Sequence, residues 1–223
     1  MQALAGARRV LDVGGGTGNY AAALRDEGFD VTVLDYNADM LERAAAKGLP
    51  TVQGDAMALP FADDSWDAVT MIAMMHHVPD WRAAIAEARR VAGRVVKAGW
   101  SREHIDEVTW VSDYWTLPWA DDSHPPLATV LAELPGAEVT PVFYEDTDDL
   151  NLAALQCHPE LILDPAVRRQ TSYFERLADN APDELEAGLE RLRADLAAGV
   201  DPRERVAAAR ARLGDIAVLA WRR

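Results

Sequence analysis

A glycine-rich turn follows a short apolar segment near the start of the chain. The run VLDVGGGTGNY at 10–20 places an acid, Asp12, ahead of glycines at every second position. Glycine tolerates positive φ and has no Cβ, so the backbone can turn sharply and approach a ligand closely. Residues 20–27 are expected to form a helix whose first N–H groups face whatever lies on the glycines. The run therefore predicts a strand, a tight ligand-binding turn and a helix.

The spacing of these glycines argues against a dinucleotide site. The pattern is D-x-G-x-G-x-G, and the dinucleotide fingerprint needs a glycine three residues after Gly16, where this chain has Asn19. An acid ahead of the loop suits a ligand that carries an ammonium group and no phosphate. The alternative, a strand-to-helix turn without a ligand, stays open for the run taken alone.

Three further segments predict an alternation of strands and helices. Residues 31–35 are rich in β-branched side chains and end in an acid, where doubly wound folds accept hydrogen bonds from ribose hydroxyls. Residues 51–56 end in Gly-Asp-Ala, where a carboxylate could accept a hydrogen bond from an adenine amino group. Residues 66–73 are almost wholly apolar, as in a central parallel strand, and continue into MMHHVPDW.

Residues 9–98 resemble the cofactor-binding half of the class I S-adenosylmethionine-dependent methyltransferases. They are most similar to the branch with the motifs LDVGxGTG, GDA-x-x-LPF and hHv-x-D-W. The resemblance implies an α/β fold with a Rossmann-like, seven-stranded, mostly parallel sheet and an antiparallel last strand. It also implies S-adenosyl-L-methionine as the cofactor and S-adenosyl-L-homocysteine as the product. The cofactor has the ammonium group that suits the loop.

The same resemblance assigns cofactor-binding residues. It places Gly14 and Gly16 under the methionine moiety, Asp12 near the ammonium and Asp35 on the ribose. The residues expected beside or at the edge of the adenine are Tyr36, Met40, Asp55 and Ala56. Gly15 and Ile72 complete the expected cofactor site.

Composition limits the class of partner and the compartment. The 223 residues include 37 acidic and 22 basic side chains, a net charge of −15 that argues against a nucleic-acid partner. The single cysteine, Cys157, rules out an intrachain disulfide and fits a reducing cytoplasm. No apolar run has the length of a membrane span, and no signal-peptide pattern is present. We therefore expect a cytoplasmic protein that acts on a small molecule and binds neither nucleic acid nor membrane.

Metal-ligand spacing is also missing from the sequence. His76 and His77 are adjacent, and we expect their side chains to point in different directions, unlike the i, i+4 pairs that bind zinc from a helix. We therefore expect no metal.

The C-terminal half is larger than the family's bare fold. We expect a helix at 126–134 and strands at 94–97, 138–144 and 215–221. About 70 residues separate the last two strands, which form a hairpin in the bare fold. Helical patterns within this insertion are at 160–178, 182–198 and 203–212.

These segments predict three regions. Residues 1–145 form the cofactor-binding core, 146–212 a helical insertion, and 213–223 the last strand. The helices that often cover the substrate in the family are missing ahead of the first strand, so we expect the lid to come from the insertion or from a second subunit in a homodimer. The alternative is that the insertion is a structural buttress.

Aromatic residues are concentrated between 100 and 119. They are candidate walls of the acceptor pocket, with simple packing as the alternative: Trp100, Trp110, Tyr114, Trp115 and Trp119. Phe174, in the first helical part of the insertion, is a further candidate substrate-binding residue.

The implied chemistry is an in-line displacement in which an acceptor O, N or C attacks the methyl group, so that alignment supplies much of the rate. His77 is the first candidate for a general base, and a packing or helix-capping role is its alternative. Asp113, Glu145 and Asp146 are weaker candidates for this base.

Two other functions stay open. One is binding of S-adenosylmethionine without methyl transfer, as a sensor or a cyclisation catalyst, and the other is methylation of tRNA or protein.

Overall fold

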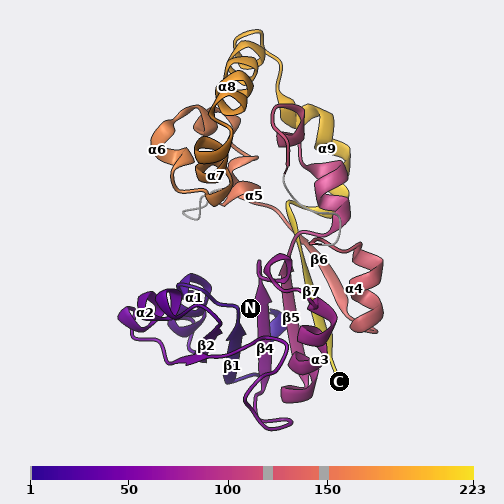
Figure 1. Ribbon diagram of the computed structural model, residues 1–223. Helices are drawn as coiled ribbons and strands as arrows, with labels where there is room; N and C mark the ends of the chain where they lie inside the picture. The colour runs from indigo at the N-terminus through magenta and orange to yellow at the C-terminus, as the bar shows by residue number, and fades with distance from the viewer. Residues whose placement is uncertain (1, 118–122, 146–150) are drawn as a thin grey trace. The chain divides into compact units, whose positions relative to one another are not determined.

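The chain folds into two compact units. The computed structural model describes residues 2–117, 123–145 and 151–223 (Figure 1). The first unit comprises Met1–Trp100, Ala120–Thr140 and Ala217–Arg223, and the second comprises Ser101–Trp119 and Pro141–Ile216. The second unit thus includes residues 101–119 in addition to the expected insertion.

The sheet has seven strands in the order β3-β2-β1-β4-β5-β7-β6. Strands β1 to β5 pair in parallel, whereas β7 runs antiparallel to β5, with Val95 opposite Trp221 and Gly99 opposite Ala217. This confirms the expected Rossmann-like, mostly parallel sheet with an antiparallel last strand. The strands are β1 (Arg9–Val13), β2 (Asp30–Asp35), β3 (Thr51–Gln53), β4 (Ala68–Ile72), β5 (Arg94–Gly99), β6 (Glu138–Val142) and β7 (Ile216–Arg222).

Helices cover both faces of the sheet in the first unit. Helices α1 (Asn19–Asp26) and α2 (Ala38–Ala46) pack on one face, with Val10, Val31 and Val96 in the shared core. Helices α3 (Trp81–Val91) and α4 (Leu127–Glu133) pack on the other (Figure 1). The short turns η1 (Gln2–Leu4) and η2 (Met75–His77) complete this unit. Because both faces are covered, β1 is buried except at Arg9, and β4 is buried except at Ile72, which is partly buried.

The second unit is helical. Helix α8 starts at a proline, where the missing N–H costs nothing, as expected from the sequence. The elements of this unit are η3 (His104–Val108), η4 (Val111–Asp113), α5 (Leu152–Leu155), η5 (Pro159–Leu163), α6 (Pro165–Arg168), α7 (Ser172–Asn180), α8 (Pro182–Ala197) and α9 (Pro202–Leu213). Within the described residues, none of the helices is both long and apolar enough to cross a membrane.

The helical segment expected at 160–178 is broken into three pieces, so that expectation is corrected. Pro165 lacks the N–H that a continuous helix needs, and Asp164 instead caps a new helix by accepting a hydrogen bond from the Ala166 N–H at 2.7 Å. The chain turns again before Ser172, where α7 begins.

A close helix–aromatic contact holds the second unit together. The Trp115 indole lies directly against Gly188 of α8 and donates a hydrogen bond to the Leu185 carbonyl at 3.2 Å. A Cβ at Gly188 would overlap this indole. Glycine is therefore required at this position by packing, although it is a poor helix former.

We predict that Gly188→Ala lowers the free energy of unfolding by about 1–3 kcal/mol, because overlap with a buried indole outweighs the gain in helix propensity. Urea denaturation measures this change. Gly93→Ala is the control, since apart from its chain neighbours no residue in the described part of the structure lies within 4 Å of a Cβ there, and its effect should stay within about 0.5 kcal/mol. A Gly188→Ala protein as stable as the wild type would show that Trp115 can move aside.

Candidate cofactor-binding and catalytic site

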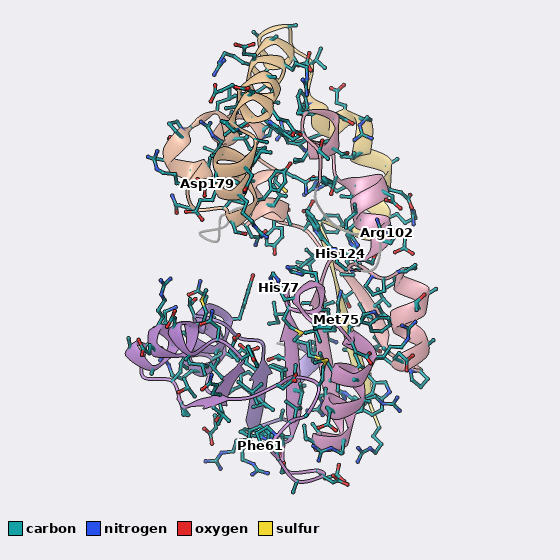
Figure 2. All side chains as sticks on the ribbon, viewed as in Figure 1. Phe61, Met75, His77, Arg102, His124 and Asp179 are labelled. Carbon is teal, nitrogen blue, oxygen red and sulfur yellow. The ribbon has the colours of Figure 1, made fainter. Side chains whose placement is uncertain are left out.

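The expected cofactor residues gather at one edge of the sheet. Parallel strands end at the same edge, and ligands of open α/β sheets bind there. The glycine loop follows β1, Asp35 ends β2, Asp55 follows β3 and Ile72 ends β4. Figure 2 shows His77 at this end of the sheet and Phe61 at the opposite end.

The glycines of the loop have different surroundings. Gly14, at φ +68°, packs against Met74, whose Cβ would lie 2.7 Å from an added Cβ. A Cβ at Gly15 would overlap the Asp12 carboxylate. At Gly16, with φ +54°, no heavy atom of the described residues beyond its chain neighbours lies within 4 Å of an added Cβ. Of these three glycines, Gly16 is the one that faces open space.

Asp12 is a buried carboxylate beneath this loop. Its Oδ1 accepts a hydrogen bond from the Thr70 hydroxyl at 2.7 Å, and its Oδ2 accepts none from the described residues. Burial raises the pKa of Asp12 from 3.8 to about 6; the Thr70 hydrogen bond opposes this and the nearby Asp35 charge adds to it. Gly15 covers the carboxylate, so the geometry gives Asp12 a direct role in shaping the loop. Its expected place near an ammonium group stays a prediction.

Asp35 ties the glycine loop to the end of β2. One carboxylate oxygen accepts a hydrogen bond from the Gly16 N–H at 2.8 Å, and the other accepts one from the Asn37 N–H at 2.9 Å. Each oxygen retains a second lone pair for a ligand hydroxyl. The expected ribose-binding role of Asp35 is compatible with this geometry.

The residues expected around an adenine differ in exposure. Tyr36 is 79% exposed, whereas Met40, Ala56 and Ile72 are partly buried. Asp55 is also partly buried, and its Oδ1 accepts a hydrogen bond from the Met57 N–H at 2.8 Å. Their contacts with a cofactor stay predictions.

Three histidines form a row at the same end of the first unit. His77 is exposed, and its ring centroid lies 3.9 Å from that of His76. The expectation that these two side chains diverge is therefore wrong: the 3₁₀ turn η2 brings the rings into contact. His76 in turn stacks on the buried His124, with centroids 5.0 Å apart and planes at 12°. Figure 2 labels both His77 and His124.

Sequence reasoning missed His124 and Lys97. His124 lies far from the histidine pair along the chain, and no spacing pattern connects them. Lys97 is buried in β5 and donates a hydrogen bond to the Trp100 carbonyl at 3.0 Å. Burial lowers its pKa from 10.5 to about 8. A lysine within the apolar run at 95–98 was the available signal.

The aromatic candidates fall into both units. Trp100, in the first unit, is partly buried, and its centroid lies 6.3 Å from that of His124. Tyr114, Trp115 and Phe174 are buried in the second unit, where the rings of Trp115 and Phe174 meet edge to face at 5.2 Å. This burial favours packing, the alternative that the sequence left open. Their substrate-binding role stays a prediction.

The weaker candidates for a general base differ in ion pairing and exposure. Asp113 pairs with Arg205 at 2.6 Å, and Glu145 is exposed. Trp119 and Asp146 lie outside the described residues. Among the residues that the structure describes, no three His, Cys, Asp or Glu side chains are grouped to hold a metal ion.

We predict a pH-dependent contribution of Asp12 to stability. Its folded-state pKa lies above the ordinary value of 3.8, so the folded protein takes up this proton first as the pH falls. The free energy of unfolding should therefore rise by about 2–3 kcal/mol, relative to Asp12→Asn, between pH 7.5 and pH 4. Urea denaturation of both proteins across this range provides the test. Parallel pH profiles would show that Asp12 has an ordinary pKa.

Comparison with known proteins identifies the domain that carries this site. A family model described as a methyltransferase domain matches residues 11–94. A demethylmenaquinone methyltransferase of Renibacterium salmoninarum is 40% identical over 99 residues, which cover 42% of each chain. A ubiquinone/menaquinone biosynthesis C-methyltransferase of Paracoccus denitrificans is 39% identical over 123 residues, or 49% of each chain. The matches thus span less than half the length of these curated relatives.

A solved structure matches nearly the whole chain. That structure is described as a methyltransferase from an antibiotic biosynthesis pathway of Anabaena variabilis. The match has a TM-score of 0.78 and 27% identity, and it covers 96% of this chain and 90% of the other. The protein therefore carries the methyltransferase domain and the fold of the class I S-adenosylmethionine-dependent methyltransferases.

Proposed function

We propose that the protein transfers a methyl group from S-adenosylmethionine to a small-molecule acceptor. The observation that carries the proposal is the open face at Gly16, next to the Asp35 carboxylate and above the buried Asp12. Sequence-similar relatives that are named as quinone-pathway methyltransferases support the same activity.

The residues present fit the cofactor. The open space at Gly16 would admit the methionine moiety, and the Asp35 oxygens would accept hydrogen bonds from ribose hydroxyls. The Oδ2 of Asp12, which accepts no hydrogen bond from the described residues, supplies negative charge below an ammonium group. Tyr36, Met40, Asp55, Ala56 and Ile72 would surround the adenine. When bound, the cofactor supplies a methyl group on a sulfonium, which is already activated toward displacement.

The chain's own part in the reaction is alignment and proton transfer. An acceptor that must lose a proton needs a base within hydrogen-bond reach. His77 is exposed at the end of the sheet and has the residue type to accept that proton near neutral pH. An acceptor that is already nucleophilic would need alignment alone.

The net charge of −15 favours a small molecule over a nucleic acid, since phosphate binding calls for a basic surface. Protein methylation, and cofactor binding without transfer, are the other outcomes of the tests below.

We also place the protein in the cytoplasm, because its one cysteine fits a reducing compartment. From its place in the chain, we propose the helical insertion as the substrate lid, with a second subunit of a homodimer as the alternative.

The test of activity uses the purified protein, S-adenosylmethionine and a panel of acceptors that starts with reduced naphthoquinones. Mass spectrometry should detect an acceptor heavier by one methylene, together with equimolar S-adenosylhomocysteine. His77→Ala should lower turnover by about 100-fold if the acceptor must lose a proton. Cofactor binding without product from any small molecule, protein or tRNA would contradict the proposed transfer.

We predict that Asp35→Ala weakens S-adenosylhomocysteine binding at least about tenfold, because charge-assisted hydrogen bonds are lost. Gly16→Val should abolish binding, since a branched side chain would enter the open space. Titration calorimetry measures both. Asp30→Ala is the matched control, because Asp30 is exposed at the other end of β2. Wild-type affinity in Asp35→Ala would remove this residue from the site.

A further inference from the structure

A pocket of about 530 Å³ lies entirely within the second unit. Its volume falls in the range of small-molecule sites. Its apolar wall consists of Val108, Trp110, Phe143, Val206, Ala207 and Ala211. Trp110 and Val206 are buried, whereas Phe143 and Ala207 are exposed, so Phe143 supplies the accessible aromatic surface of the pocket. None of these residues belongs to the glycine-loop site.

Gln156 provides the pocket with an unsatisfied polar group. The residue lines the pocket and is only 7% exposed, and its Oε1 accepts no hydrogen bond from the described residues. A buried carbonyl oxygen without a donor costs free energy. The terminal amide torsion of glutamine is broad, so the oxygen can turn toward a ligand at little cost. A ligand with an O–H group would satisfy it.

The charges at the pocket are already neutralised. Arg210 donates to both oxygens of Asp215, at 2.6 and 2.8 Å. Arg203 makes the same kind of pair with Asp201, at 2.9 and 2.7 Å, and also donates to the Cys157 carbonyl. Burial raises the pKa of the Cys157 thiol to about 11, which keeps it neutral at pH 7. The lining therefore favours an uncharged ligand.

We propose that this pocket is a binding site for a neutral aromatic molecule whose hydroxyl group donates a hydrogen bond to Gln156. The Phe143 ring and the apolar lining supply contact area, and the amide oxygen supplies the orientation. The inference does not depend on methyl transfer, because it concerns a site built from the helical unit alone.

The test is equilibrium dialysis of the full chain at pH 7 with three probes of similar size. 2-Naphthol can donate a hydrogen bond, 2-methoxynaphthalene can only accept one, and 2-naphthoate is an anion. 2-Naphthol should bind about fivefold more tightly than 2-methoxynaphthalene, the ratio expected for one hydrogen bond. Gln156→Met should remove this preference while leaving 2-methoxynaphthalene binding unchanged.

A pair of variants on α9 locates the binding. Ala207→Trp places a ring in the pocket and should reduce 2-naphthol binding at least tenfold. Ala208→Trp adds the same ring to the neighbouring exposed position, which is outside the lining, and should bind like the wild type. Circular dichroism and thermal unfolding confirm that each variant is folded. Absence of saturable 2-naphthol binding to the wild type, equal loss in both tryptophan variants or tighter binding of 2-naphthoate would overturn the proposal. Loss of S-adenosylhomocysteine binding would not affect it.

Discussion

A buried carboxylate beneath a glycine is the constraint on which the candidate site depends. Asp12 occupies the space where Gly15 would otherwise carry a Cβ, and Met74 does the same at Gly14. The loop is thus shaped from below by packing, and Asp35 fixes it from the side through the Gly16 N–H. Because these contacts come from three strand ends, the open face at Gly16 is a property of the folded sheet.

The same end of the sheet combines charges of both signs. Asp12 and Asp35 lie on the side of β1 and β2, where a ligand cation would be stabilised. Lys97 lies within β5, and its ammonium group holds the Trp100 carbonyl where the chain leaves that strand. With a pKa of about 8, Lys97 is mostly protonated at neutral pH, and burial makes that charge costly. The lysine therefore orders the backbone beside the histidine row.

The second unit uses its aromatic residues mainly as core. The Tyr114 hydroxyl donates to Asp195 at 2.7 Å, and the Trp110 indole donates to the main-chain carbonyl of Gln156 at 3.0 Å. Tyrosine and tryptophan are well suited to this role because each joins a large apolar ring to a donor that needs a partner. The side chains at the rim of the pocket are those that are not packed into this core.

The sequence by itself determined the alternation of strands and helices and the place of the glycine loop. These follow from local signals: a glycine turn after an apolar strand, and strands that end in acids. It also predicted α8, which a proline and an apolar period mark locally, and a further short helix at 203–212 that corresponds to α9. It did not predict the breaks at Pro165 and before Ser172, where capping interrupts a helical pattern.

Only the tertiary structure decided which glycine faces open space, which aromatic residues are buried, and that His124 stacks on His76. Each of these outcomes depends on a contact between residues far apart in the chain. Such contacts leave no periodic signal, because burial on one face of a strand or helix does not specify which distant side chain covers it. The local pattern therefore fixed where a ligand could bind, and long-range packing fixed which atoms are left to bind it.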